Sequence, residues 1–452
     1  MSTGFIFIEL DKPYYYAGDT VTGHINVNLF QDFDGAKMTL KLKGWESTYW
    51  ITQTRVHDTP ENPFRPPRDE LMDKSDCEVT SDSTDSSDVK EKSKKGYVRK
   101  GGAYYRITHH TGGKEFMKLK QKMSQFGDGH INRGQHKIPF SFALSSGWPG
   151  TFTYKTKTCK GRIKYEMRVK CKFYDKKDRD FEHKVEVMVH EKPTKQMKSQ
   201  NQTMEAKVVS CCCINKGTSK ITLGFEKDQY AIGEDATLFC EVDNSSSEAK
   251  INSIVGSLVN QITLRAKNGT VFNVNQTIST VNFGDCEAGS FFLGESRRVK
   301  QLHIDNKKGG WKKCVNPTST GKFVNSTYYI AAESNMDTFC SCCCGSDPRV
   351  QIPVLIIPPP LHQPEFQPPQ DWQPQAYPVF NIPLPPEQYQ DYNTVNPMDP
   401  YQGGNNYNQV QPTNQGPYNP MNQPPQMQQQ QYQQQPQYQQ QQQQDMPPQP
   451  PM

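Results

Sequence analysis

No stretch of this sequence approaches the roughly 18 to 20 consecutive apolar residues that a membrane-spanning helix needs. The opening residues, "MSTGFIFIEL", have no basic region ahead of the apolar ones, so they predict a strand rather than a signal peptide. We therefore expect a cytosolic chain. Because thiols stay reduced in the cytosol, its 13 cysteines are not expected to form structural disulfides.

Catalytic signatures are missing as well. The sequence contains no phosphate-binding P-loop, no G-x-S-x-G and no H-E-x-x-H. The neighbouring histidines His109, His110, His130 and His136 lack a convincing metal-ligand spacing, and we interpret them as solvated loop residues. The sequence thus predicts a binding protein that has no catalytic residue and is not an enzyme.

Lysine and arginine are absent from residue 358 to residue 452, a segment of Gln, Pro, Asn and Tyr with six acidic residues. This tail carries −6 formally and residues 1–357 carry +11, which together give the net charge of +5. The tail cannot bury enough apolar surface to offset chain entropy, so we expect it to be disordered. The basic remainder favours anionic partners such as phosphorylated peptides, phosphoinositide headgroups or nucleic acid.

Helical periodicity is nearly absent, and alternation with a period of two dominates residues 1–357. Stretches such as "GFIFIEL", "AKMTLKLKGW" and "HKVEVMVHE", and later "KITLGFE" and "VQIPVLII", read as short strands separated by turn residues. The two sets predict an all-β chain with two tandem immunoglobulin-like antiparallel β-sandwiches. The expected limits are 1–192 for the first sandwich, 193–209 for a linker, 210–357 for the second sandwich and 358–452 for the tail.

A polar, highly charged segment at 59–122 interrupts the first set and reads as an insertion. Its Ser and Thr residues beside Asp, as in "SDSTDSSD", resemble sites for acid-directed kinases. The alternative is an unmodified solvated loop.

A short pattern occurs twice. Tyr and Ala precede Gly and an acid at Tyr16 to Asp19, and again, with one residue inserted, at Tyr230 to Glu234. Alternating strand residues follow both copies. The pattern predicts the same tight turn between two strands at the start of each sandwich.

Together with "QHKIPFSFALSSGWPGTFTY", "GRIKYEMRVKCKFYD" and "STGKFVNSTYYIAAES", these strand starts resemble the arrestin family, most closely its α-arrestin or arrestin-domain-containing branch. The resemblance covers residues 1–357 except the charged insertion. It implies the arrestin fold and an adaptor without catalytic chemistry. Such adaptors bind cytosolic segments of membrane proteins and couple them to endocytic, sorting or ubiquitination machinery, at the plasma membrane or endosomes.

The strand "CKGRIKYEMRVKCKF" carries the most information about a binding site. Ile163, Tyr165, Met167, Val169, Cys171 and Phe173 share one parity and should face the core. The opposite face would present a basic stripe, interrupted by Glu166: Lys160, Arg162, Lys164, Arg168, Lys170 and Lys172. We predict that this stripe receives an anionic cargo segment, as the resemblance also implies. The alternative is a solvated face that is neutralised by neighbouring strands or by the acidic insertion.

Two motifs stand out in the tail. "YPVF", Tyr377 to Phe380, fits the tyrosine sorting pattern Y-x-x-Φ, which clathrin adaptors bind as an extended strand. Many relatives in the family carry a PPxY ligand for ubiquitin ligases, and here the nearest approach is "PPEQY", with Pro385, Pro386 and Tyr389 spaced one residue too far. The terminal Gln-rich run could drive self-association or be neutral.

Seven cysteines form two clusters, Cys211, Cys212 and Cys213 in "VVSCCCINKG" and Cys340, Cys342, Cys343 and Cys344 in "FCSCCCGSDP". Three interpretations remain open: a zinc site, S-palmitoylation or direct lipid contact, and small apolar residues that fill loop space. In the arrestin fold both loops lie at the outer tip of the second sandwich, so the resemblance favours zinc or lipid over space filling.

The leading hypothesis is an arrestin-like cytosolic adaptor that binds membrane cargo through its first sandwich, trafficking or ubiquitin-ligase proteins through its tail, and an acidic membrane surface. The alternative is a membrane-associated scaffold whose Gln-rich tail drives self-association. Nucleic-acid binding ranks last, because the aromatic residues of the basic strand fall on its core face. No cofactor is expected, apart from the candidate zinc.

Overall fold

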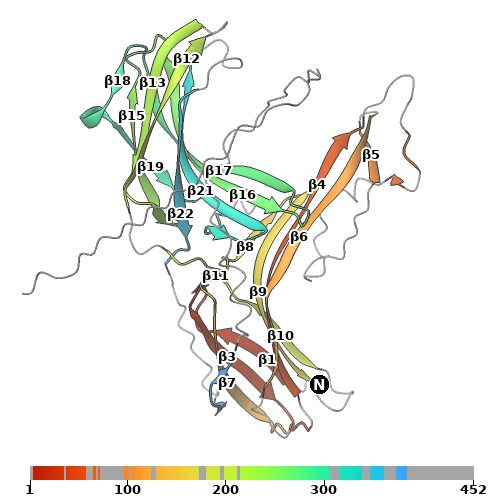
Figure 1. Cartoon of the computed structure of the whole chain (residues 1–452). Coiled ribbons are helices and arrows are strands. Elements are labelled where there is room, and N and C mark those ends of the chain that lie inside the picture. Colours follow the sequence, from red (N-terminus) through yellow and green to blue (C-terminus); the bar gives the residue numbers. More distant parts are fainter. Residues whose placement is uncertain are drawn as a thin grey trace, which may run out of the picture. The chain divides into compact units, whose positions relative to one another are not determined.

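Figure 1 shows the computed structural model, in which strands account for nearly all of the regular structure. The structure describes residues 4–34, 37–56, 65–67, 70–71, 96–100, 103–123, 129–172, 180–193, 198–210, 214–305, 315–337, 347–360 and 373–383. Within these ranges, no helix is long and apolar enough to cross a membrane.

The first sandwich consists of two main sheets. One sheet has the order β1 (Gly4–Leu10), β3 (Thr20–Leu29) and β7 (Gly134–Ala143), and two short strands lie on the β7 edge, β23 (Gln375–Ala376) and β24 (Phe380–Asn381). The other has the order β10 (Phe181–Glu186), β9 (Cys159–Lys172), β4 (Lys37–Arg55), β6 (Ala103–Lys122) and β5 (Gly96–Lys100), with β8 (Phe152–Lys155) beside β9. A small parallel pair, β2 (Tyr15–Tyr16) and β11 (Val189–His190), completes it.

The second sandwich repeats this plan. One sheet has the order β12 (Gln200–Ser210), β13 (Ile214–Phe225), β15 (Asp235–Asp243) and β18 (Phe291–Phe292), with β19 (Arg298–His303) also on β15. The other has the order β14 (Gln229–Ala231), β22 (Arg349–Ile357), β21 (Val324–Met336), β16 (Ile251–Arg265) and β17 (Val271–Cys286), with β20 (Ser319–Thr320) on β21. The predicted pair of tandem antiparallel sandwiches is therefore confirmed.

Each sandwich has its own hydrophobic core, made by the inward-facing residues of its two sheets. Trp148, Phe140 and Tyr165 are among the large side chains buried in the first core, and Phe225 and Tyr230 among those buried in the second. A few residues of the second sandwich pack into the first core: Ile262, Leu264, Ala266 and Val324. The two sandwiches thus share apolar contacts around the ends of β16 and β21.

The repeated turn predicted from the sequence is present in both sandwiches. Asp19 Oδ2 accepts a hydrogen bond from the backbone N–H of Tyr16 at 3.0 Å, and Glu234 Oε2 accepts one from Ala231 at 2.9 Å. The glycine before each acid has a positive φ, 90° at Gly18 and 91° at Gly233. Each turn follows a short strand with a parallel partner, β2 with β11 and β14 with β22.

Part of the predicted insertion belongs to the fold. Residues 96–100 and 103–122 form β5 and β6, and β6 pairs with β4 along most of its length, as the orange strands in Figure 1 show. The sequence prediction of an insertion over all of 59–122 was wrong there, because exposed lysines alternate with core residues such as Phe116 and hide the strand pattern.

The predicted boundaries of the linker and of the tail also differ from those in the structure. Most of the expected linker at 193–209 is strand, because β12 starts at Gln200 and pairs with β13. In the tail expected to be disordered from residue 358, residues 373–383 are an exception, because they carry β23 and β24.

Candidate anion-binding face

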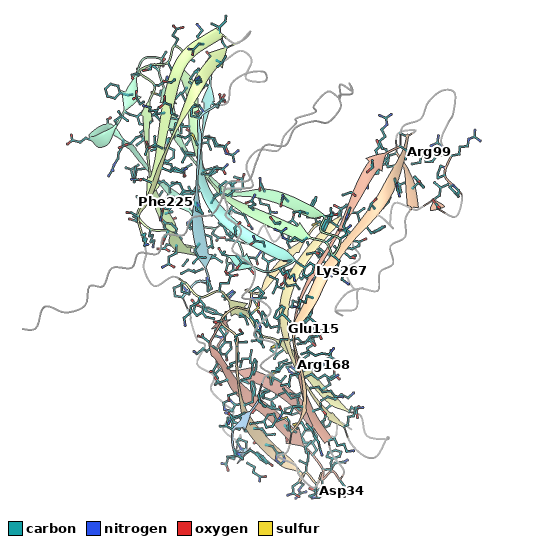
Figure 2. All side chains as sticks on the ribbon, in the orientation of Figure 1. Asp34, Arg99, Glu115, Arg168, Phe225 and Lys267 are labelled. Carbon is teal, nitrogen blue, oxygen red and sulfur yellow. The ribbon has the colours of Figure 1, made fainter. Side chains whose placement is uncertain are left out.

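Strand β9 alternates as its sequence predicts. Ile163, Tyr165, Met167, Val169 and Cys171 are fully buried, while Phe173 lies outside the described residues. Of the opposite parity, Arg162, Lys164, Arg168 and Lys170 are half-buried and Lys172 is exposed. The basic stripe therefore lies on the outer face of the sheet, where Figure 2 labels Arg168.

Lys160 is the exception in the stripe. Only 4% of its surface is exposed, so it cannot present its charge to a partner in solution, and its assignment to an exposed stripe was wrong. At this end of the sheet, hydrogen bonds also connect the first sandwich to the second. The Thr48 hydroxyl donates to the backbone carbonyl of Arg265 at 2.6 Å, and the Lys267 N–H donates to the carbonyl of Thr111 at 2.9 Å.

Acidic residues on β10 and at its start neutralise much of the stripe. Lys164 pairs with Glu186 at 3.1 Å, and Arg168 pairs with Glu182 at 3.1 Å. Lys170 lies 2.8 Å from Asp180, whose hydrogen bond raises the pKa of Lys170. Neutralisation by a neighbouring strand, the alternative left open by the sequence, is thus present on this side of the face.

The neighbouring strands β4 and β6 extend the same face with further lysines. By register, Lys41 on β4 lies directly between Arg168 on β9 and Lys120 on β6, and Lys184 on β10 lies opposite Arg168. One row across four strands is therefore entirely cationic. Like charges placed directly opposite one another destabilise a sheet. Glu166 and Glu182 neutralise Lys184 and Arg168, so the uncompensated part of the row is Lys41 and Lys120.

The lysines on β4 and β6 differ in how they are paired. Lys43 and Lys118 share Glu115, which is labelled in Figure 2, at 3.5 and 2.9 Å. Four others on these strands, and Lys172 at the end of β9, are exposed and form no ion pair with any described residue: Lys37, Lys41, Lys120, Lys122 and Lys172. We call these five side chains the open lysine group. The face thus has a neutralised side along β9 and β10 and an open side along β4 and β6.

Sequence reasoning missed the open side, although a signal for it exists. In "KMTLKLKGW" the lysines at 37, 41 and 43 share one parity, and in "KLKQK" those at 118, 120 and 122 do the same. Strand alternation would have placed each set on one face. That the two sets lie side by side depends on the pairing of β4 with β6, which is not local in sequence.

Comparison with known proteins agrees with this architecture. Residues 6–192 match the family model for the N-terminal domain of arrestin (or S-antigen), and residues 215–361 match that for its C-terminal domain. The chain belongs to the arrestin family. The candidate face therefore lies on the N-terminal arrestin domain.

A curated relative supports the assignment. The chain is 22% identical over 358 residues to "Arrestin domain-containing protein A" of Dictyostelium discoideum, a match that covers 78% of this chain. It covers 51% of the relative, so the chain spans about half the length of that protein.

The tyrosine motif lies against the N-terminal arrestin domain. Tyr377 is half-buried, and Phe380 is 7% exposed and joins the first core. Of the other predicted tail residues, Pro385, Pro386 and Tyr389 lie outside the described residues.

Both cysteine clusters also lie outside the described residues, Cys211 to Cys213 between β12 and β13 and Cys340 to Cys344 between β21 and β22. Four cysteines elsewhere are buried and free: Cys159, Cys171, Cys240 and Cys286. Burial raises the pKa of the Cys159 and Cys171 thiols to about 12, which keeps them protonated and unreactive at neutral pH. Among the described residues, no group of His, Cys, Asp and Glu is arranged to hold a metal ion.

The histidines were predicted to be solvated loop residues, and this is wrong for three of the four. His110 on β6 stacks on Trp50 with ring centroids 4.9 Å apart, and His109 lies 2.7 Å from the Tyr49 hydroxyl. His136 on β7 is only 2% exposed. His130 alone is exposed as expected, 2.5 Å from Asp34.

Proposed function

We propose that this chain is an arrestin-like adaptor that holds an anionic segment of a membrane protein on the open lysine group of its N-terminal domain. The observation that carries the proposal is the adjacent pair Lys41 and Lys120 in the cationic row, together with the other exposed lysines of the group, none of which has a described acidic partner. The family membership supports an adaptor role without catalysis.

The geometry suits an extended acidic or phosphorylated peptide. Residues two apart on a strand are separated by about 6.6 to 7 Å on one face, and an extended peptide alternates at the same spacing. A ligand that lies along β4 and β6 can therefore place successive negative side chains near Lys120 and Lys122, or near Lys41. Each such contact also relieves the repulsion within the row.

The remaining parts of the hypothesis follow from the tail and from the cysteines. We propose that the tail connects the bound cargo to sorting or ubiquitin-ligase proteins. The missing PPxY motif argues for a ligand of another kind. We also propose that the adaptor works at the cytosolic surface of the plasma membrane or endosomes, and that the two cysteine clusters supply either acylation sites or a zinc site.

The test is a binding titration with the full chain and labelled peptides, one carrying several phosphoserines and one carrying none. We compare Lys41→Gln/Lys120→Gln with a control that removes the same charge elsewhere, Lys207→Gln/Lys300→Gln, both exposed residues of the second sandwich. A hydrogen bond to a charged group contributes about 1.5 kcal/mol or more, so loss of two phosphate contacts should weaken phosphopeptide binding at least tenfold. The affinity of the double variant should also depend less on salt concentration.

If both double variants lose the same phosphopeptide affinity, the loss reflects the protein's net charge and not a local site, and the proposal is overturned. Binding of anionic vesicles with no binding of either peptide would assign the face to a membrane surface instead.

A further inference from the structure

The chain's own segment 375–382 lies on the outer edge of β7. Gln375 and Ala376 pair in parallel with His136 and Lys137, and Phe380 and Asn381 pair in parallel with Phe140 and Ser141. On its other edge β7 pairs with β3 along its whole length. The segment therefore occupies a position that an extended peptide from another molecule could also fill.

Three side chains anchor this segment. Phe380 and Ile382, 7% and 4% exposed, belong to the first hydrophobic core, and Tyr377 packs against that core. The residues between and before them face solvent, and Val379 is 55% exposed. The anchors thus follow a Tyr-x-x-Phe-x-Ile pattern, whose first two members are the residues that define the predicted sorting motif.

The tyrosine hydroxyl meets a specific partner. Tyr377 Oη lies 2.8 Å from His136 Nδ1, and His136 Nε2 lies 2.8 Å from the backbone carbonyl oxygen of Asn132. A carbonyl can only accept, so Nε2 carries a proton and donates it. In the neutral imidazole Nδ1 is then the acceptor, and the tyrosine hydroxyl donates. A phosphotyrosine has lost that donor and would bring negative charge to a buried ring.

Further hydrogen bonds add to the pairing of the two short strands with β7. The Ile382 N–H donates to the Ser141 carbonyl at 2.9 Å, and the Gln373 N–H donates to Gln135 Oε1 at 2.9 Å. Pro378 separates the two short strands and has no N–H to contribute. Side-chain pockets together with a short backbone ladder are the usual basis of peptide recognition by strand addition.

We propose that the β7 edge is a docking site for an extended, unphosphorylated peptide with the pattern Tyr-x-x-Phe-x-Ile, and that residues 375–382 occupy this site within the same chain. A partner segment with the same pattern competes for it. While residues 375–382 are docked, Tyr377 and Phe380 are not available to any other protein that reads a tyrosine motif. The site is separate from the open lysine group and does not depend on its function.

The test uses a fluorescent peptide of residues 373–383, QPQAYPVFNIP, titrated with the full chain. The docked segment has a high effective concentration because it is tethered, so the unmodified chain should bind the free peptide weakly. Phe380→Ser/Ile382→Ser removes two anchors from the segment and should increase affinity for the peptide at least about tenfold. Val379→Ser, in the same segment but exposed, is the matched control and should leave the affinity unchanged.

Changes in the peptide test the His136 contact without altering the protein. Replacing its tyrosine by phenylalanine should weaken binding about fivefold to tenfold, as expected for one lost hydrogen bond. The phosphotyrosine peptide should show no saturable binding. Lys41→Gln/Lys120→Gln should leave all of these values unchanged, which separates this site from the proposed anion-binding face.

If the anchor variant fails to fold, Tyr377→Phe provides the second variant, because it keeps the ring, removes the hydroxyl that contacts His136 and should raise peptide affinity a few-fold. The proposal is overturned if a folded variant with a weakened segment binds the peptide no better than the Val379→Ser control. It is equally overturned if the phosphotyrosine peptide binds as well as the unmodified one.

Discussion

Glu46 Oε2 accepts a hydrogen bond from the backbone N–H of Phe323 at 2.7 Å, which links a buried residue of β4 to the turn that leads into β21 of the second sandwich. The same carboxyl group accepts the N–H of Lys322 and of Val324, at 3.1 and 3.0 Å. One side chain thus satisfies three successive backbone donors, which would otherwise be left without partners between the two sandwiches.

We expect Glu46→Ala to destabilise the chain by about 2 to 4 kcal/mol, because buried N–H groups lose their acceptor. Glu46→Gln keeps one acceptor oxygen and should lose roughly half as much. The measurement is the shift in denaturant midpoint, together with amide hydrogen exchange at residues 322–324, which should accelerate in the Ala variant. Unchanged exchange there, with a lower midpoint, would show that the stability loss arises elsewhere.

The acidic residues of β10 should act as competitors of an anionic ligand. Glu182 lies 3.1 Å from Arg168 and 3.7 Å from Lys170, so Glu182→Gln removes one of the two carboxylates beside each cation, while Glu166 and Asp180 remain. We expect phosphopeptide affinity to rise a few-fold. Glu205→Gln on β12, which breaks an exposed pair with Lys220, removes the same charge and is the control. The same gain in both variants would contradict a local effect.

The sequence predicted best those features that depend on neighbouring residues. Alternation assigned the core side of β9 correctly from Ile163 to Cys171, and the spacing of Tyr, Gly and acid predicted both copies of the turn. These features follow from strand geometry, in which successive side chains point to opposite faces. They therefore need no knowledge of which strands pair.

Features that depend on distant pairing could not be predicted. Strand alternation places Lys160 on the outer face but does not reveal that it is buried, and the order at Phe380 results from pairing with β7, far away in the sequence. Likewise, whether the β9 cations are free depends on the register that places Glu182 and Glu186 beside them. Alternation gives the face of a residue but not the strand that lies next to it.

The two turn glycines allow a comparison of backbone strain with and without crowding. A Cβ at Gly233 would have no neighbour within 4 Å, whereas one at Gly18 would lie 3.4 Å from the Ser146 Cβ. We expect Gly233→Ala to cost about 1 to 2 kcal/mol, because a side chain disfavours positive φ, and Gly18→Ala to cost slightly more. Gly→Asn should be milder at Gly233 because Asn tolerates this conformation better. Equal stability of Gly233→Ala and the unmodified chain, measured by denaturant midpoint, would contradict the strain argument.

His190 should make the stability of the N-terminal domain depend on pH. Its ring is buried against Tyr14, and burial lowers the pKa of His190 from 6.5 to about 4. The folded state therefore holds the neutral ring, while the unfolded chain binds a proton below pH 6.5. This contribution is fully present above pH 6.5 and is lost as the pH falls towards 4, by roughly 3 kcal/mol at most.

The checking measurement is denaturant unfolding at a series of pH values for the unmodified chain and for His190→Phe, which keeps an aromatic ring beside Tyr14. Other groups titrate in the same range, among them Glu191, whose pKa is raised by burial, so the difference between the two proteins is the relevant quantity. That difference should shift in favour of the variant between pH 6.5 and 4. Parallel stability curves across this window would show that His190 does not gain a proton on unfolding.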